Sequence, residues 1–344
     1  MSGTGSAAGG ADGRASDDAG YHVGFDIGGT RLKTGVVLGD GSVERPTVDD
    51  TAALDFDGVL PLIRSHAREH LAAAGPGCRG FGIALPGIVE PAFGSRYLPG
   101  KVLGIEDFPL RERLEDEFGV PVRCVNDGQA ATLAEWRFGA ATGYDDVVGL
   151  TLGTGVGSGV VIGGLPFTTS SLGNGVSVGH FTIHTGGKLC LCGNRGCAET
   201  LVSANAIAGK LRDALSRLVP SILSEEFARD PRAITFRSLV DGVRAMDRVS
   251  IEILDEFTRD LGAVIVTAIH AYNPSIVVVA GGPMAAADLF LADVQRYVDE
   301  YAFIFPKDRR IPIVRARLES HAGVLGAVAF VIAELDGPRR SAQA

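Results

Sequence analysis

Cysteine is the residue whose placement first suggests chemistry. Three of the chain's five cysteines stand within eight positions, in the stretch CLCGNRGCAET that runs from Cys190 to Thr200. Thiols grouped so closely can form a redox pair, a disulfide or a metal site. Structural disulfides are disfavoured in the reducing cytoplasm, where this chain is expected. The choice therefore depends on the other motifs of the chain.

A glycine pair follows the first predicted strand, in the stretch FDIGGTRLK. Gly28 and Gly29 can adopt a positive φ and leave no side chain above the turn, so a phosphate could lie against the backbone amides there. The neighbouring residues offer a hydroxyl, a positive charge and a carboxylate suited to a phosphate-bound Mg²⁺: Thr30, Lys33 and Asp26. The simpler alternative is a tight hairpin that binds nothing.

A second glycine hairpin, LGTGVGSG, repeats this pattern further along the chain. Glycine weakens a strand interior unless another backbone or a ligand comes close. Thr154 stands between Gly153 and Gly155, where its hydroxyl could donate to phosphate. Packing and binding explain one such hairpin equally well, whereas two hairpins facing one cleft would favour binding.

A carboxylate stands where a predicted strand meets a predicted helix, in the stretch VNDGQAA. Asn and Asp are preferred at helix N-termini, so Asn126 and Asp127 could simply cap the helix. The functional alternative makes Asp127 a general base, because α/β sheets present catalytic groups at the carboxyl ends of their strands. The two roles can coexist.

These motifs lie in a succession of strands and helices that indicates an α/β protein with two lobes. The predicted strands are 21–27, 31–38, 80–89 with a Pro86-Gly87 turn, 120–125, two strands within 146–164, 275–282 and 311–318. The predicted helices are 59–74, 110–118, 129–138, 204–218, 236–244, 251–271, 285–300 and 322–335.

Composition limits the classes of partner. The 344 residues carry a formal charge of −9, which argues against a nucleic-acid surface, since such surfaces are normally basic. No apolar run approaches the ~18 residues of a membrane span. Residues 1–20 are mainly Gly, Ala, Ser and Asp, and are predicted to form a disordered tail. They lack the features of a secretory signal, so a cytoplasmic protein is expected.

Taken together, the motifs resemble the ROK family of sugar kinases and repressors, in the actin-like ATPase superfamily. The resemblance covers roughly residues 21–335. It rests on DIGGT as the first phosphate loop, LPG after the third strand, ND as the catalytic pair, LGTGVGSG as the second phosphate loop, VVVAGG as the adenosine segment and HAGVLGAVAF as the last helix.

The resemblance implies a two-lobed actin-like ATPase (ribonuclease H-like) α/β fold with a structural zinc knot in the larger lobe. After the tail of residues 1–20, the small lobe is expected to comprise 21–126 plus 319–337, and the large lobe 127–318. Family members are often dimers or tetramers, so a homodimer or homotetramer is expected, without nucleic acid or membrane as a partner.

The family's zinc knot, of one histidine and three cysteines, implies an assignment for the clustered thiols. Here VGH supplies a histidine ten residues before Cys190. Four such ligands suit a closed tetrahedral Zn²⁺ site, and Cys-x-Cys is not the usual Cys-x-x-Cys redox spacing. The implied ligands are His180, Cys190, Cys192 and Cys197.

The implied activity is transfer of phosphate from ATP, with Mg²⁺, to the primary alcohol of a sugar, whose proton Asp127 would accept. The implied substrate-binding residues are Pro86, Gly87, Asn126, Asp127, Ser177, His180 and Glu199. The implied nucleotide-binding residues are Asp26, Gly28, Gly29, Thr30, Lys33, Gly153, Thr154, Gly155, Gly281 and Gly282.

The chain departs from the family's sugar-kinase pattern in two places. Many family kinases read Gly-Glu-x-Gly-His before the first zinc ligand, whereas VSVGH places Ser177 at the glutamate's position. After LPG they tend to have an asparagine, whereas this chain offers Arg96, Gly100 and Lys101. A site built to hydrogen-bond certain hydroxyls rejects analogues that lack them. Glucose itself is therefore in question, and a C7-cyclitol with an exocyclic CH₂OH is the alternative acceptor.

Two further classes of function remain. Family repressors carry a helix-turn-helix domain before the sugar-binding lobes, and about twenty residues before the first strand are too few for one. A catalytically silent sugar sensor has no support, because Asp26, Thr30, Thr154 and Asp127 are all present. A kinase is therefore the favoured class.

Overall fold

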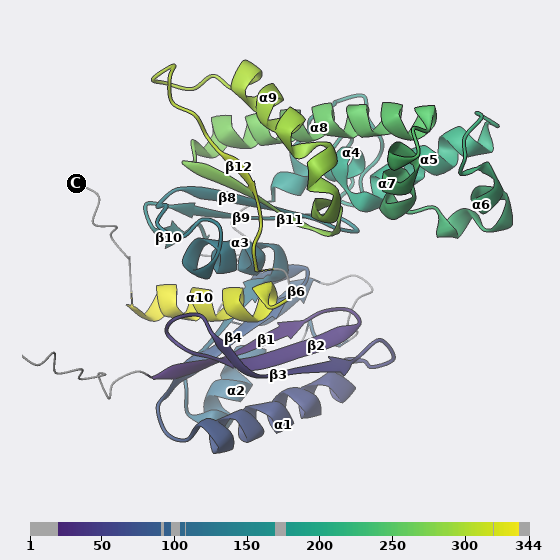
Figure 1. Cartoon of the computed structure of the whole chain (residues 1–344). Coiled ribbons are helices and arrows are strands. Elements are labelled where there is room, and N and C mark those ends of the chain that lie inside the picture. Colours follow the sequence, from purple (N-terminus) through teal and green to yellow (C-terminus); the bar gives the residue numbers. More distant parts are fainter. Residues whose placement is uncertain are drawn as a thin grey trace, which may run out of the picture.

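The computed structural model describes residues 20–90, 93–97, 104–106, 108–168, 177–318 and 320–336. Within them the chain forms two five-stranded sheets, with helices around and between the sheets (Figure 1). The predicted disordered tail lies outside the described residues, except for its last position, Gly20.

The two sheets share one plan. In each, a hairpin provides two antiparallel strands, and two later strands continue the sheet in parallel from the hairpin's first strand. The first sheet has the order β3 (Val43–Asp50), β2 (Arg31–Val37), β1 (Tyr21–Ile27), β4 (Cys78–Leu85) and β7 (Val122–Asn126). The second has the order β10 (Leu165–Pro166), β9 (Val156–Ile162), β8 (Val147–Leu152), β11 (Ile276–Gly281) and β12 (Ile313–Arg315). A small separate sheet pairs β5 (Ile88–Glu90) with β6 (Gly94–Tyr97).

The helices form layers on these sheets (Figure 1). Two helices lie on the outer side of the first sheet, α1 (Phe56–Ala74) and α2 (Leu110–Phe118). Two lie between the sheets, α3 (Asp127–Phe138) and α10 (Ala322–Asp336). The remaining helices lie in the half of the molecule that contains the second sheet (Figure 1). They are α4 (Glu199–Val202), α5 (Ala204–Ser216), α6 (Ser224–Arg229), α7 (Phe236–Arg244), α8 (Arg248–Tyr272) and α9 (Leu291–Tyr301), with the 3₁₀ turns η1 (Val178–His180), η2 (Pro231–Ala233) and η3 (Gly282–Leu289).

Glycines let the two central helices lie directly against neighbouring backbone. A Cβ atom at Gly24 in β1 would lie 2.6 Å from the carbonyl oxygen of Val324 in α10. A Cβ atom at Gly326 in α10 would lie 1.7 Å from the carbonyl oxygen of Ala130 in α3. Because any side chain would collide there, α10 contacts the first sheet on one side and α3 on the other at close range.

Most predicted elements are present, and two differences have physical causes. The helix predicted for 285–300 is divided into η3 and α9, since Phe290 between them has a non-helical φ of −146°. The strand β3 was not predicted, because it contains Pro46 and alternates with many charged residues. It lies at the edge of the sheet, where a proline removes no interior ladder bond.

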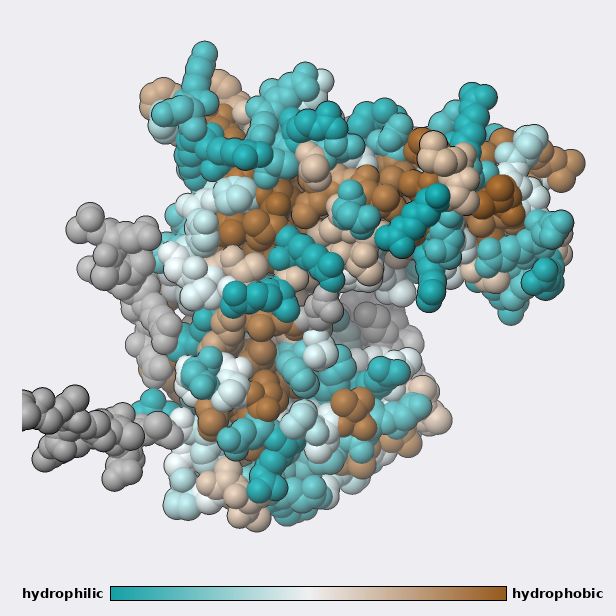
Figure 2. Space-filling view, in the orientation of Figure 1, coloured by the Kyte–Doolittle hydropathy of each residue, from teal (hydrophilic) through white to brown (hydrophobic). Residues whose placement is uncertain are grey.

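The surface view shows polar side chains over the outer parts of both halves and a band of hydrophobic residues across the upper half (Figure 2). Among the residues that the structure describes, no helix has both the length and the apolar character needed to cross a bilayer.

Candidate active site

Asp26 lies near the carboxyl end of β1, opposite Lys33 of β2. Lys33 Nζ is 3.7 Å from Asp26 Oδ2 and donates to the carbonyl oxygen of Ser320 at 3.5 Å. The start of α10 covers the carboxylate, since a Cβ atom at Gly323 would lie 2.4 Å from Asp26 Oδ2. Burial raises the pKa of Asp26, the Lys33 charge lowers it, and the Asp127 carboxylate raises it. The two carboxylates therefore lie within electrostatic reach of each other.

Asp127 is the first residue of α3, and its side chain is exposed. Asn126 caps the helix, because its Oδ1 accepts from the N–H groups of Gly128 at 2.9 Å and Gln129 at 3.3 Å. Asn126 Nδ2 donates to the carbonyl oxygen of Gly87 at 2.9 Å, which ties the end of β7 to the turn after β4. Asp127 Oδ1 accepts from Gly128 N–H at 2.8 Å. The helix N-terminus also favours a negative charge there.

The second glycine loop joins β8 to β9 and lies beside the start of α3. Gly153 N–H donates to the carbonyl oxygen of Gly155 at 2.9 Å, and Thr154 is exposed between them. A Cβ atom at Gly128 would lie 2.9 Å from the Cα atom of Gly157 in β9. The second loop is thereby held next to the helix whose first residue is Asp127.

The first glycine loop differs from the prediction in backbone conformation at Gly28. Its N–H donates to the carbonyl oxygen of Arg31 at 2.8 Å, which closes a tight hairpin with Thr30 exposed at its tip. Gly28 does not adopt the positive φ that was expected to be open to Gly28 and Gly29, and φ is not left-handed at Gly153 or Gly155 either. Position 155 requires glycine because a side chain there would collide with Glu199, as described below.

The adenosine segment ends β11 beside the second glycine loop. Gly281 pairs with Leu152, the last residue of β8. Its φ of 102° is left-handed, and a Cβ atom would lie 1.9 Å from the carbonyl oxygen of Leu152, so only glycine fits. No atom would lie within 4 Å of a Cβ at Gly282, so the backbone there borders open space. Both glycines lie where the predicted adenosine could approach the backbone.

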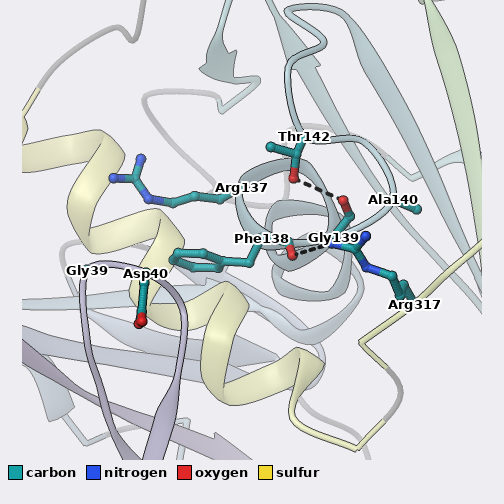
Figure 3. Close-up of a pocket in the computed structure, with 8 residues that line it drawn as sticks. All are labelled: Gly39, Asp40, Arg137, Phe138, Gly139, Ala140, Thr142 and Arg317. Atoms are coloured by element: carbon teal, nitrogen blue, oxygen red, sulfur yellow. Dashed lines mark hydrogen bonds between the residues drawn. The ribbon is translucent and has the colours of Figure 1, made fainter.

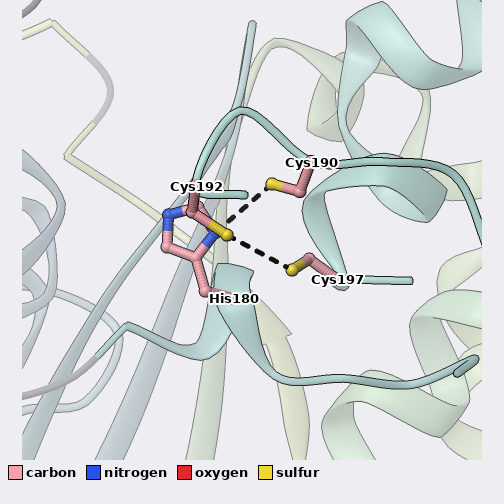
Figure 4. Close-up of side chains that lie close together, drawn as sticks. All are labelled: His180, Cys190, Cys192 and Cys197. Atoms are coloured by element: carbon pink, nitrogen blue, oxygen red, sulfur yellow. Dashed lines mark hydrogen bonds between the residues drawn. The ribbon is translucent and has the colours of Figure 1, made fainter. Parts of the chain in front are cut away.

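The four predicted metal ligands come together in the structure (Figure 4). Their ligand atoms all lie within 4.8 Å of one another. Cys190 Sγ is 3.6 Å from His180 Nδ1, and Cys192 Sγ is 3.6 Å from Cys197 Sγ. A tetrahedral zinc ion with Zn–S and Zn–N bonds of roughly 2.3 and 2.0 Å separates its ligand atoms by about 3.6–3.8 Å. The three thiols and the imidazole therefore fit Zn²⁺ in both chemistry and spacing.

Burial raises the pKa of the Cys197 thiol to about 12 in the absence of a cation. A bound cation reverses this preference, because metal ligation deprotonates thiols. The cluster thus depends on a positive charge to hold its buried sulfur atoms as thiolates.

Glu199 connects the cysteine cluster to the second glycine loop. Its Oε2 accepts from the N–H of Val156 at 3.1 Å, and its Oε1 is 3.9 Å from Cys190 Sγ. A Cβ atom at Gly155 would lie 2.4 Å from Glu199 Oε2. The glutamate that the resemblance assigned to the substrate therefore also contacts the loop assigned to the nucleotide.

The remaining predicted substrate residues lie around this cluster and the turn after β4. Ser177 is exposed, and its carbonyl oxygen accepts from the N–H of His180 at 3.0 Å. Pro86 is buried, and Gly87 has a φ of 83° in the turn that Asn126 holds. Gly100, Lys101 and the side chain of Arg96 lie outside what the structure describes.

A cavity of about 620 Å³ lies away from these residues, at the C-terminal end of α3 (Figure 3). Asp127 is at the opposite end of the same helix. The cavity is lined by Gly39, Asp40, Arg137, Phe138, Gly139, Ala140, Thr142 and Arg317. None of these residues was predicted to act in the site, so we place neither the nucleotide nor the sugar in this cavity.

Comparison with known proteins identifies the relatives of the chain. The family model described as "ROK family" matches residues 22–334. The chain belongs to the ROK family. It is 32% identical to the glucokinase of Thermotoga maritima, over 92% of this chain and 98% of the relative. It is also 30% identical to the N-acetylglucosamine repressor of Escherichia coli, over 72% of this chain and 59% of the repressor.

Solved structures give the same result. The ROK hexokinase of Thermus thermophilus superposes with a TM-score of 0.76 at 29% identity, covering 92% of this chain and 99% of that one. A ROK glucokinase of Streptomyces griseus, solved with glucose and AMPPNP, superposes with a TM-score of 0.72 at 26% identity, covering 90% and 98%. The mixed α/β fold expected from the resemblance is therefore confirmed.

Two residues of the site were absent from the sequence predictions. Val156 supplies the N–H group that Glu199 accepts, and Gly323 makes the close approach of α10 to Asp26. A glycine at the start of a predicted helix was the one available signal for Gly323. The donor at position 156 could not be predicted from its residue type, because every residue except proline has a backbone N–H group.

Proposed function

We propose that the protein is an ATP-dependent kinase that phosphorylates the primary, exocyclic CH₂OH hydroxyl of a hexose or hexose-like substrate. The observation that carries this proposal is the placement of Asp127. Its exposed carboxylate begins α3, lies within electrostatic reach of Asp26 and stands beside the strand that follows the second glycine loop. Similarity to glucokinases over nearly the whole chain supports the same reaction.

In this reaction Asp127 accepts the hydroxyl proton while the alcohol oxygen bonds to the γ-phosphorus and the bond to the ADP oxygen breaks. The carboxylate is suited to this role because it is exposed and is kept at a helix N-terminus by the Asn126 cap. Positioning and electrostatic stabilisation supply most of the catalysis in phosphoryl transfer. Mg²⁺ bound with ATP would neutralise the triphosphate, and Asp26 would hold it through its waters.

The two glycine loops would bind the phosphates. The four glycines Gly28, Gly29, Gly153 and Gly155 carry no side chain, and Thr30 and Thr154 are exposed at the loop tips. The N–H groups of Gly28 and Gly153 donate within their own hairpins, so the phosphates would contact the threonine hydroxyls and the other amides of the loops. Lys33 would act on phosphate through Asp26, with which it pairs in this structure. Gly281 and Gly282 would let the adenosine lie on the end of β11, next to the second loop.

We assign the cysteine cluster to structural zinc, held by His180, Cys190, Cys192 and Cys197. A closed four-ligand site supplies folding energy and no open position for chemistry. Its contribution to the reaction would be to fix His180 and Glu199, which the resemblance places at the substrate. The Glu199 bond to Val156 supports this role, because it joins the cluster to the loop beside the nucleotide.

A C7-cyclitol is the second candidate acceptor, and Ser177 is the observation that favours it. The family's glutamate is replaced here by an exposed, shorter and neutral hydroxyl. A serine can donate as well as accept, so it reads a different pattern of hydroxyls from a carboxylate. Both candidate acceptors share the exocyclic CH₂OH group that Asp127 would activate.

We retain two further assignments as proposals. The small lobe comprises residues 21–126 plus 319–337 and the large lobe 127–318, so that α3 and α10 face each other across the lobe boundary. The predicted homodimer or homotetramer also stays a prediction. A repressor is the less favoured function, because the exposed Asp127 beside Asp26 serves no purpose in binding DNA.

The experiment that tests the proposal measures ADP release with glucose, mannose, N-acetylmannosamine, allose and C7-cyclitols, with the product identified by ³¹P NMR. We expect release well above the acceptor-free rate for at least one hexose or cyclitol, with a phosphomonoester at the CH₂OH carbon. Acceptor-independent rates throughout the panel would overturn the kinase assignment. If glucose were the best acceptor, Ser177 would no longer favour the cyclitol.

A further inference from the structure

Glu135 is a buried carboxylate near the C-terminal end of α3. Its side chain accepts hydrogen bonds from backbone N–H groups in two parts of the chain, one just after the helix and one far away in the sequence. The residue is 1% exposed. Its Oε2 accepts from the N–H of Ala140 at 2.7 Å, just beyond the helix. Its Oε1 accepts from the N–H of Arg317 at 2.8 Å and of Leu318 at 2.6 Å, more than 180 positions away.

These bonds lie at a special point of the fold. In the described residues the chain passes between the two sheets twice, from β7 into α3 and from β12 into α10. Arg317 and Leu318 belong to the second passage, immediately before α10 (Figure 1). Glu135 thereby fastens the second passage to the helix that forms the first.

A cavity lies on the outer side of this junction. The cavity of about 620 Å³ is lined by Arg317 and by residues 137–140 (Figure 3). Arg317 adds a second link, because its Nη2 donates to the carbonyl oxygen of Phe138 at 3.0 Å. Hydrogen bonds fix the junction on the side that opens to the cavity.

A displacement at the junction would be transmitted to the active site by the two central helices, α3 and α10. Asp127 is the first residue of α3, whereas Asp26 is covered by Gly323 at the start of α10. The two helices touch at Ala130 and Gly326 without intervening side chains. A shift between α3 and α10 would therefore change the placement of Asp127 relative to Asp26.

We propose that Glu135 is a positioning residue that forms the pivot of the two lobes. By holding residues 317 and 318 to the end of α3, it fixes the relation between α3 and α10, and so keeps Asp127 aligned with Asp26 when the lobes move. The inference rests on the proposed function, since the alignment matters for transfer from a nucleotide to an alcohol. Its effect on the junction itself can be measured without that reaction.

The test compares Glu135→Leu with Glu115→Leu, because leucine removes every accepting oxygen, whereas the amide oxygen of glutamine could still accept from Arg317 and Leu318. The control residue Glu115, in α2, also accepts from a backbone N–H, that of Val122 at 2.9 Å, but both residues belong to the first sheet and its helices. Gly139→Ala is a second probe of the pivot, because a Cβ there would lie 2.0 Å from Glu135 Oε2 and 2.7 Å from Glu135 Cα. It would displace the carboxylate, together with the end of α3, without removing it.

The first readout is amide hydrogen exchange at residues 317 and 318 in the unliganded protein. Loss of a hydrogen bond opens an amide by about tenfold, so both pivot variants should exchange about tenfold faster there, with β1 and β8 unchanged. Glu115→Leu should leave the two amides protected. Unchanged exchange in Glu135→Leu would overturn the pivot, whether or not the wild-type protein phosphorylates any alcohol.

The second readout is the ratio of ADP released to alcohol phosphorylated. Misplacement of a catalytic group by ~1 Å can cost on the order of 10²-fold. Glu135→Leu should lower kcat by about tenfold or more, with a smaller change in the KM for ATP, and should raise the ratio above one because water competes as acceptor. A lower melting temperature with unchanged kcat and an unchanged ratio would show a purely structural role and overturn the proposal.

If the wild-type protein phosphorylated no alcohol, the proposed function would fail, and hydrogen exchange alone would decide the pivot. Faster exchange at 317 and 318 in both pivot variants would then support it. Protection equal to that of Glu115→Leu would overturn it.

Discussion

At the scale of single residues, the site turns on a carboxylate that is partly buried beside a second one. Burial and the Asp127 charge raise the pKa of Asp26, and Lys33 opposes them from 3.7 Å. If Asp26 must be ionised to order the metal's waters, Lys33 sets the lowest pH at which the site works. The amino group thus acts on the reaction through Asp26.

Replacing Lys33 by methionine should move the acid limb of the kcat/KM profile to higher pH. Without the positive charge, the pKa of Asp26 rises further, and an opposite charge at this distance is worth on the order of one pH unit. Lys33→Arg keeps the charge and serves as the control, with a profile close to the wild type. A methionine variant with an unmoved acid limb would show that Asp26 does not titrate in the reaction.

At the scale of elements, the cysteine cluster and the second glycine loop form one unit. Glu199 follows the last cysteine of the cluster closely and accepts from Val156 N–H at the start of β9. Damage to the cluster should therefore reach the loop. Stability and substrate binding would change together.

Cys197→Ser should release the metal and destabilise the protein, on the order of several kcal/mol, because metal binding and folding are coupled at structural zinc sites. Wild-type protein should carry about one zinc per chain by elemental analysis. The KM for the acceptor should rise with the loss. Cys78→Ala, in β4 and outside the cluster, should keep its metal. A Cys197→Ser variant with wild-type zinc content would contradict the assignment.

The helix α1 is attached to the first sheet through a buried polar network. Thr34 Oγ1 in β2 is hydrogen-bonded to His70 Nε2 in α1 at 2.7 Å and to Thr47 Oγ1 in β3 at 2.7 Å. Burial, followed by the charge of His66, lowers the pKa of His70. The folded protein therefore binds fewer protons than the unfolded chain between the folded pKa of His70 and about 6.5, its value when unfolded.

Since the unfolded state binds more protons in that window, the free energy of unfolding rises with pH through it and falls as the pH drops. We expect a lower urea midpoint at pH 5.5 than at pH 7.5. His70→Gln should reduce this difference, whereas His184→Gln, at an exposed position, should preserve it. An equal pH dependence in His70→Gln would show that another group causes the acid destabilisation.

Sequence patterns located most elements, because each reflects local chemistry. Alternating hydrophobic residues predicted β1 and β2, and the Asn126-Asp127 pair predicted the start of α3. The edge strand β3 was not predicted, since its charged residues and Pro46 are not typical of a strand and it is not buried. The helical pattern at 285–300 did not reveal the break at Phe290, because hydrophobic periodicity does not record a local change of dihedral angles.

Contacts between distant segments could not be predicted from residue types. The helix cap by Asn126 was one of the alternatives that the sequence offered, whereas the bond from its amide to the carbonyl oxygen of Gly87 was not predicted. Its contact with a sugar stays a prediction. Glu135 stands in an apolar helical stretch, LAEW, and its partners lie more than 180 positions away. A buried glutamate in such a stretch was the one available signal. Only the folded structure shows that its oxygens accept from backbone N–H groups.

At the scale of the whole molecule, two sheets of the same plan meet through α3 and α10. Each sheet supplies a glycine loop at the carboxyl end of its first hairpin strand, and the two carboxylates come from opposite sides of the lobe boundary that we propose. Catalysis in this arrangement depends on both halves at once, so the most informative variant changes one of the two carboxylates and leaves the fold intact.

Asp127→Asn is that variant, because an amide keeps the size of the side chain and loses the basic oxygen. The direct measurement is the rate of phosphoryl transfer from ATP to the best acceptor of the panel, with zinc content and melting temperature as controls. A general base accounts for at least about 10²-fold, so the rate should fall by that factor or more, with metal and stability unchanged. A folded, zinc-containing variant that transferred phosphate at the wild-type rate would contradict the account.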